Sequence, residues 1–147
     1  MSILEKIESD YIVALKNKEA EKVSVLRMLK AELHNAKIEK KADLEESEEI
    51  LVLNKEVKKR QDSVEQYQKG NRPELADKEL NEITIIKNYL PKQISEVELE
   101  QIVEKAITET NAKEIKDMGK VMPIVIAQVK GAADNSKIAQ VVKQKLA

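Results

Sequence analysis

The sequence predicts an all-α protein, with an N-terminal four-helix domain followed by a smaller three-helix C-terminal domain. Apolar residues recur at spacings of three and four almost throughout the chain, which is the pattern of amphipathic helices. Gly and Pro number only three each among 147 residues, too few turn formers for a fold of many strands. The AVILMFWYC residues make up 41% of the chain but aromatic residues only 2%, so the core must consist mainly of Leu, Ile, Val and Ala.

The first two helices are expected over about 3–18 and about 19–41. Ser2 and Glu5 have the S-x-x-E spacing of a capping box, which predicts that the first helix begins beside them. The second helix is indicated by apolar residues at core spacing, namely Leu26, Leu29, Leu33 and Ala36.

The third and fourth helices are expected to meet at a sharp turn. Asp43 and Glu46 form a second capping pair, which predicts a long third helix ending near Lys69. The sequence Gly70-Asn71-Arg72-Pro73 then combines a stop signal with a proline suited to the first position of a new helix. Pro91 ends the fourth helix, because the residue before a proline is driven away from helical geometry.

A domain boundary is expected at Leu90-Pro91-Lys92-Gln93, which divides the chain into domains 1–91 and 92–147. Pro123 falls inside the middle helix of the second domain and removes one backbone hydrogen bond, to the carbonyl of Gly119. The three short helices of that domain are expected after Ser95, over about 118–130 and after the N-cap residues Asp134-Asn135-Ser136.

Several kinds of chemistry are excluded or disfavoured by composition. The chain has no Cys, which excludes disulfides, thiolate zinc sites and cysteine nucleophiles, and its single His excludes multi-His metal sites. The chain also lacks the glycine-rich phosphate loops and the G-x-S-x-G nucleophile motif. We therefore expect no resident metal and no cofactor, and catalysis by this chain alone is disfavoured.

The chain is expected to be cytoplasmic and not to enter a membrane. Its uninterrupted apolar runs reach only about four residues, far short of a spanning helix. The N-terminal sequence MSILEKIESDY carries acids and lacks the apolar core of a signal peptide.

Arg60 is predicted to lie in the core or at its edge, because it continues the apolar stripe of the third helix. An unpaired charge buried there would cost about 3–5 kcal/mol, so a partner is required. The expected partners are Glu79 and Glu82 of the next helix, with Arg72 joining the same structural ion-pair cluster. An anion-binding pocket is the functional alternative, and replacement of Arg60 alone by Leu should destabilise the fold.

The C-terminal end of the chain is its basic part. Residues 118–147 hold five lysines and a single acid, Asp134. The Gly131 bend would let backbone N–H groups approach a phosphate. No aromatic residue lies there to stack on bases, so any nucleic acid should be recognised through its backbone and shape. The candidate nucleic-acid-binding residues are Lys120, Lys130, Gly131, Lys137 and Lys143; the alternative is a plain solvated surface.

A secondary basic face is expected on the second helix, where basic residues follow one another at alternating spacings of three and four. Its members are Arg27, Lys30, His34 and Lys37, followed by Lys41. Such a face suits phosphate contact, although most faces of this kind are only solvated. His34 itself is expected to be solvated, because the sequence suggests no orienting acid beside it.

Several ordered motifs resemble the YqeY family: Lys59-Arg60-Gln61-Asp62-Ser63, Tyr89-Leu90-Pro91, Asp117-Met118-Gly119-Lys120 and Val129-Lys130-Gly131. That family is similar to the helical tail of GatB, a subunit of the glutamine-dependent tRNA amidotransferase. The resemblance implies a larger N-terminal and a three-helix C-terminal domain. It also implies a tail that helps to hold tRNA, with Lys120, Lys130, Gly131 and Lys137 at tRNA-facing positions.

Three functional hypotheses follow. The first is a non-catalytic module that binds tRNA or another structured RNA. The second is an adaptor that offers an apolar groove of its N-terminal helices to a protein partner, with Leu44, Leu51 and Val52 as the candidate surface. The third is carbon–nitrogen ligase activity with glutamine as amido donor, which would follow only from relatedness to GatB.

Overall fold

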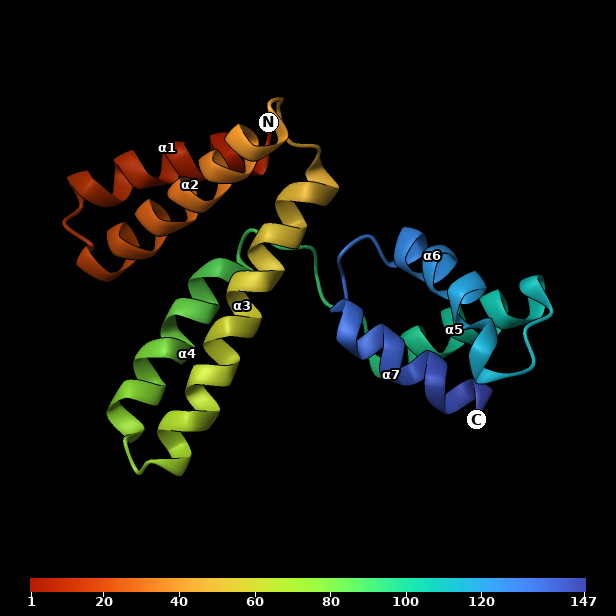
Figure 1. The fold of residues 1–147 in the computed structure, drawn as a ribbon. Helices are drawn as coiled ribbons and strands as arrows, with labels where there is room; N and C mark the ends of the chain where they lie inside the picture. The colour runs from red at the N-terminus through yellow and green to blue at the C-terminus, as the bar shows by residue number, and fades with distance from the viewer. The chain divides into compact units, whose positions relative to one another are not determined.

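The structure is a computed structural model that describes all of residues 1–147. It contains seven α-helices, one short 3₁₀ helix and no strand, which confirms the predicted all-α class (Figure 1). The chain forms two compact units, Met1–Leu90 and Pro91–Ala147, here called the N-terminal unit and the C-terminal unit. Each has its own hydrophobic core.

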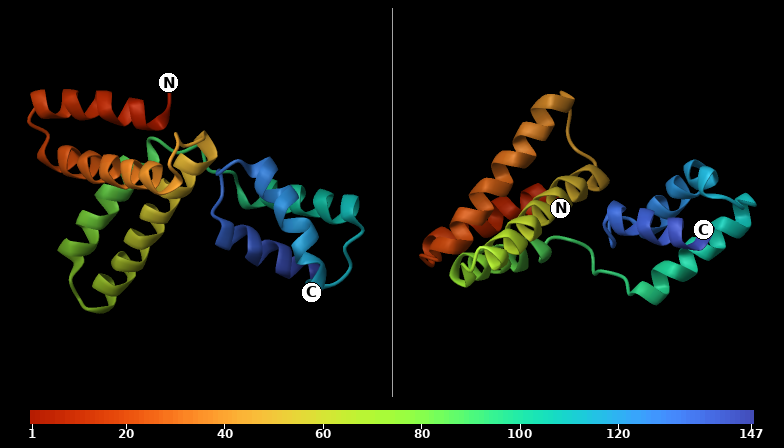
Figure 2. Two further views of the ribbon diagram at one scale, coloured as in Figure 1. Left: turned by 45° about the horizontal axis from the view of Figure 1, so that its top comes forward. Right: turned by 60° about the horizontal axis from the view of Figure 1, so that its bottom comes forward.

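The N-terminal unit consists of two antiparallel helix pairs, α1 with α2 and α3 with α4 (Figure 2). The four helices are α1 (Ile3–Lys16), α2 (Ala20–Lys40), α3 (Glu46–Lys69) and α4 (Pro73–Lys87). The leucines expected in the core of α2, Leu26, Leu29 and Leu33, are fully buried. Ile7, Leu53 and Ile86 meet them from the other three helices, so the core is aliphatic as the composition requires.

Most helix ends of this unit follow the sequence signals, but the start of α3 does not. The Glu5 N–H donates to Ser2 Oγ at 3.1 Å, and Pro73 is the first residue of α4, both as predicted. The start of α3 at Asp43 was wrong, because Glu45 is the N-cap and forms its capping box with Glu48. The residues between α2 and Glu45 are used to reverse the chain.

The C-terminal unit contains α5 (Glu96–Thr110), the 3₁₀ helix η1 (Ile115–Asp117), α6 (Met118–Val129) and α7 (Asn135–Leu146). Ser95 caps α5 and Asp134 caps α7, as the sequence predicts. The 3₁₀ turn was not predicted, and α6 continues through Pro123 as one helix. The core of this unit is built on fully buried residues, namely Val103, Val121, Val125, Ile138 and Val142.

None of the helices has both the length and the apolar character that crossing a membrane requires. A cytoplasmic location stays a prediction.

Candidate nucleic-acid interface

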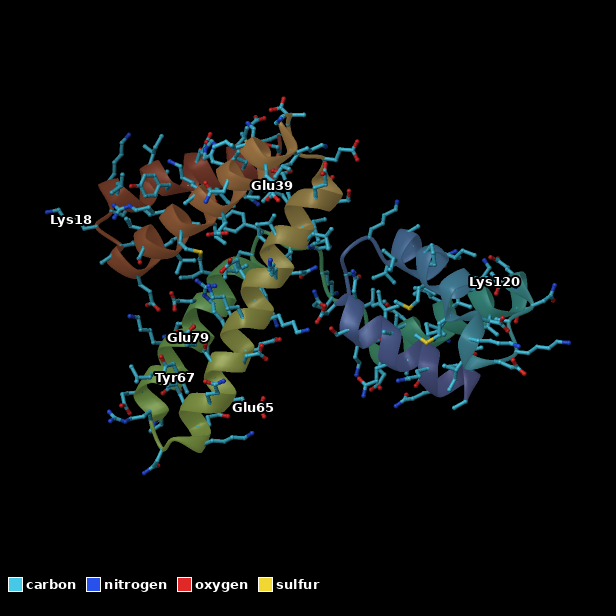
Figure 3. All side chains as sticks on the ribbon, viewed as in Figure 1. Lys18, Glu39, Glu65, Tyr67, Glu79 and Lys120 are labelled. Atoms are coloured by element: carbon cyan, nitrogen blue, oxygen red, sulfur yellow. The ribbon has the colours of Figure 1, made fainter.

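The basic part of the C-terminal unit is carried by α6 and α7. On α6, the side chains of Val121, Val125 and Val129 are buried in the core, which leaves Lys120 and Lys130 on the exposed side. Figure 3 labels Lys120 near the start of α6. Lys120 lies in the first turn of α6 and Lys130 is its C-cap, so the two lysines lie near the two ends of the helix, about 15 Å apart along its axis. Neither forms an ion pair.

The lysines of α7 divide into paired and unpaired residues. Lys137 Nζ lies 3.6 Å from Glu96 Oε1, and Lys145 Nζ lies 2.8 Å from Glu104 Oε1. Both acids belong to α5, so these pairs hold α7 against α5, and the hydrogen bond that Lys145 donates to Glu104 raises the pKa of Lys145. Lys143 is exposed and forms no ion pair. Of the predicted contact residues, Lys120, Lys130 and Lys143 therefore form no ion pair, although Lys120 lies near the Asp117 carboxylate, whereas Lys137 pairs with Glu96.

The bend between α6 and α7 is packed rather than open. Lys130 and Gly131 both have left-handed backbone angles, with φ of 51° and 83°, which explains a glycine at position 131. The Ala132 N–H donates to the carbonyl of Val129 at 3.1 Å, and the Ala132 carbonyl accepts from the Ile94 N–H at 3.0 Å. Gly131 therefore shapes the bend that positions Lys130, while the neighbouring Ala132 N–H already has a partner inside the fold.

The secondary basic face is not a free surface, because α1 lies along it. Arg27 donates to the hydroxyl of Tyr11 through Nη2 at 3.2 Å and Nε at 3.3 Å. Lys30 Nζ lies 4.5 Å from the centroid of the same ring, a cation–π contact. Lys37 Nζ pairs with Asp43 Oδ1 at 3.2 Å. The face thus serves mainly to hold α1 and the loop after α2.

His34 is exposed, as predicted for a solvated ring, but the expectation that no acid lies beside it was wrong. Its Nε2 lies 3.1 Å from Glu8 Oε1 of α1. The two residues are 26 positions apart, so local spacing gave no signal for the pair. They line a hollow of about 240 Å³ together with Asp43 and the buried Glu49. The described residues contain no group of three or more His, Asp or Glu side chains that could hold a metal ion.

Arg60 lies at the edge of the core, with only 11% of its side chain exposed, but its predicted partners were wrong. Its Nη1 donates to Glu56 Oε2 at 2.8 Å and to the Glu56 carbonyl at 3.1 Å. Glu56 precedes Arg60 by one helical turn. This i,i+4 spacing was the local signal for the ion pair, and the apolar stripe of the helix does not include it.

The other members of the predicted cluster lie apart from this pair. Glu79 and Glu82 are half-buried on α4 and form no ion pair with an arginine, and Arg72 is the exposed N-cap of α4. Burial raises the pKa of the Glu82 carboxyl, the nearby charge of Arg60 opposes the rise, and Glu79 adds to it. The charge of Arg60 therefore acts on the pKa of Glu82, although the two residues form no ion pair.

Comparison with known proteins agrees with the family resemblance. Two fungal proteins named "Altered inheritance of mitochondria protein 41, mitochondrial" are similar to this chain. The one from Pyrenophora tritici-repentis is 25% identical over 137 residues, covering 92% of this chain and 75% of the relative. The one from Lachancea thermotolerans is 32% identical over 106 residues, covering 70% of this chain and 57% of the relative.

A third relative, an uncharacterized protein of Schizosaccharomyces pombe, is 28% identical over 91 residues, which cover 62% of this chain and 74% of the relative. The family model described as "Yqey-like protein" matches residues 4–146. That match includes all seven α-helices from their first or second residue onward. The chain therefore belongs to the YqeY-like family.

Proposed function

We propose that this YqeY-like protein binds structured RNA, with tRNA as the first candidate, and that it does so without catalysing a reaction. The C-terminal unit would make the contact through RNA phosphates. The observation that carries the proposal is the set of free, exposed charges on α6 and α7, Lys120, Lys130 and Lys143. The only acid in residues 118–147 is Asp134, whose side chain is used to cap α7 by accepting from the Ser136 N–H.

The distribution of charge within the unit supports this assignment. The chain as a whole has a net charge of −1, so no general attraction to nucleic acid is expected. Acids of α5 neutralise Lys137 and Lys145, which concentrates the free positive charge on α6 and the outer side of α7. A local basic surface of this kind binds phosphates by releasing their counterions, so binding must weaken as salt is added.

The adaptor hypothesis loses part of its predicted surface. Leu44 and Val52 pack against the core of the N-terminal unit, and only Leu51 of the three candidates is well exposed. Amide transfer with glutamine as donor has no geometric observation in its favour, and it would rest on kinship to GatB alone. A glutaminase assay and an ATP-turnover assay on the purified chain test that activity directly.

The test of RNA binding is the fluorescence anisotropy of labelled tRNA, titrated with the full chain at low and moderate salt. We expect binding to weaken with salt with a logarithmic slope of about −2 to −3, because three lysines meet phosphates. The triple variant Lys120→Glu/Lys130→Glu/Lys143→Glu should bind at least about tenfold more weakly.

The matched control is Lys18→Glu/Lys55→Glu/Lys59→Glu, three exposed lysines of the N-terminal unit that form no ion pair. Lys18 and Lys130 both have left-handed backbone angles, so the two triple variants impose similar backbone demands. The control should bind like the wild type, and circular dichroism checks that both variants keep their helices. Absence of tRNA binding by the wild type, or equal loss in both variants, would overturn the proposal.

A further inference from the structure

We infer that the solvent face of α6 is the surface that lies directly against the ligand, and that the ligand at this face is double-helical RNA. The inference rests on the RNA binding proposed above. It concerns which face makes the contact and which form of RNA fits it.

The exposed side of α6 itself carries no acid, and Asp117 directly precedes the helix as its N-cap. Lys120, Pro123 and Ala127 follow one another at spacings of three and four, so they form a single row on α6, and Lys130 follows as the left-handed residue that ends the helix. All four are exposed, and the two residues between the lysines have compact side chains. No Asp or Glu occurs in Met118–Val129. A long, rigid polyanion can therefore lie against the helix and meet a lysine at each end.

Gly119 extends the same surface, and neither a close neighbour nor a left-handed backbone angle requires a glycine there. A Cβ placed on it would meet no atom within 4 Å, and its backbone angles are not left-handed. Glycine in a helix is less stable than alanine, so a purely structural position would favour alanine. Glycine is the residue that permits a close approach of the backbone by a ligand. An RNA surface that comes close to the first turn of α6 would favour glycine over alanine at position 119.

The residue types of the C-terminal unit favour a duplex over a single strand. All three tyrosines of the chain, Tyr11, Tyr67 and Tyr89, lie in the N-terminal unit, and so do all three arginines. Proteins recognise single-stranded RNA by stacking its bases on aromatic rings or guanidinium planes. They recognise double-stranded RNA by its shape and by its phosphates and 2′-hydroxyls. Lysines on a face without aromatic or guanidinium side chains therefore fit the second mode better than the first.

The test uses the full chain with three labelled probes: an RNA duplex of about 16 base pairs, one of its strands alone, and a DNA duplex of the same sequence. The wild type should prefer the RNA duplex. Ala127→Met adds bulk without charge and keeps a good helix former, and it should weaken duplex binding by about fivefold or more. Its control is Ala31→Met, at an exposed alanine of α2 in the N-terminal unit, which should bind like the wild type.

Gly119→Ala separates binding from stability, since it should raise the melting temperature and yet weaken binding. Unchanged duplex binding by both Ala127→Met and Gly119→Ala would overturn the inference. If the lysine variant still lost tRNA binding, the proposed function would stand. Preference for the single strand, or for vesicles of anionic lipid over RNA duplex, would also overturn the inference. Failure of the wild type to bind any RNA would remove the proposed function and the inference with it.

Discussion

Glu49 shows how a single buried side chain can join distant parts of the chain. The residue is only 3% exposed, and its carboxylate accepts from the Leu4 N–H at 2.9 Å and from the Ile3 N–H at 3.4 Å. These N–H groups belong to the first turn of α1, where unpaired donors and the helix dipole favour a negative charge. Glu49 therefore caps α1 from α3, across 45 positions in sequence.

The Glu56–Arg60 pair gives a prediction about stability. Replacing Arg60 by Leu leaves Glu56, which is 7% exposed, without its counter-charge, and should lower the free energy of unfolding by about 3 kcal/mol. The double variant Glu56→Leu/Arg60→Leu should recover most of that loss, because it removes both charges together. The recovery is favoured further by the buried Arg60 Nε, which has no hydrogen-bond partner even in the wild type.

Urea denaturation of the wild type, both single variants and the double variant measures this cycle. If Arg60→Leu left the free energy of unfolding unchanged, the guanidinium would not be needed to neutralise Glu56. If the double variant showed the sum of the two single losses, the two residues would act independently.

The packing of α4 beside α2 brings carboxylates together, and this gives a prediction about pH. Burial raises the pKa of Glu82 and the charges of Glu79 and Glu21 add to the rise, so ionising Glu82 is harder in the folded than in the unfolded chain. An acid with a raised pKa stabilises the fold when protonated, and that stability is lost as pH rises through the folded-state value. Glu82→Gln should therefore raise the melting temperature at pH 7 and have little effect near about pH 3, below the ordinary pKa of Glu.

Thermal unfolding of the wild type and Glu82→Gln across this pH range measures the effect. Glu74→Gln is the matched control, because Glu74 lies on the same helix as Glu82 and the two residues line one surface hollow between α2 and α4, but Glu74 is exposed. If Glu82→Gln raised the melting temperature equally at all pH values, the packing of the new side chain, and not the removal of the carboxylate charge, would explain the stabilisation.

Local signals in the sequence were enough to place the helices but not to choose their partners. The three-and-four spacing of apolar residues and the caps at Ser2, Ser95 and Asp134 depend on neighbours within one turn, so the sequence displays them directly. The pairing of His34 with Glu8 depends on how α1 and α2 cross, which no local pattern encodes.

The candidate interface was predictable to a similar extent. The sequence identified the lysines of residues 118–147, because their charge excess is a matter of composition. It could not separate the free Lys143 from Lys137, since only the packing of α7 on α5 brings Glu96 within 3.6 Å of Lys137. The start of α3 was wrong for a related reason. Asp43 and Glu45 both have a Glu three residues later, so either could begin a capping box. The chain needs the residues up to Glu45 to turn from α2 into α3, so Glu45 is the N-cap.

At the scale of the whole molecule, the residues just before and just after Pro91 indicate where the chain can be cut into fragments that fold separately. Tyr89 is 8% exposed, and its hydroxyl donates to Asp10 Oδ2 at 2.6 Å, which together with burial raises its pKa. Leu90 packs against the same core, so the N-terminal unit needs its chain up to that residue. In the C-terminal unit, Ile94 packs on the core and its N–H donates to the Ala132 carbonyl. Only the few residues from Pro91 to Gln93 lie between these anchors.

We therefore expect fragments 1–91 and 92–147 each to fold alone, with helical circular dichroism and a cooperative thermal transition. The second is close to the lower size limit for an independent domain, and its separate core makes folding possible. Fragment 1–87 loses the bond from Tyr89 to Asp10, and fragment 96–147 loses Ile94 and the Ser95 cap of α5, so each should melt at a lower temperature than its longer counterpart. If either longer fragment were unfolded while the full chain melted cooperatively, each unit would depend on the other, and the division at Pro91 would not be a domain boundary.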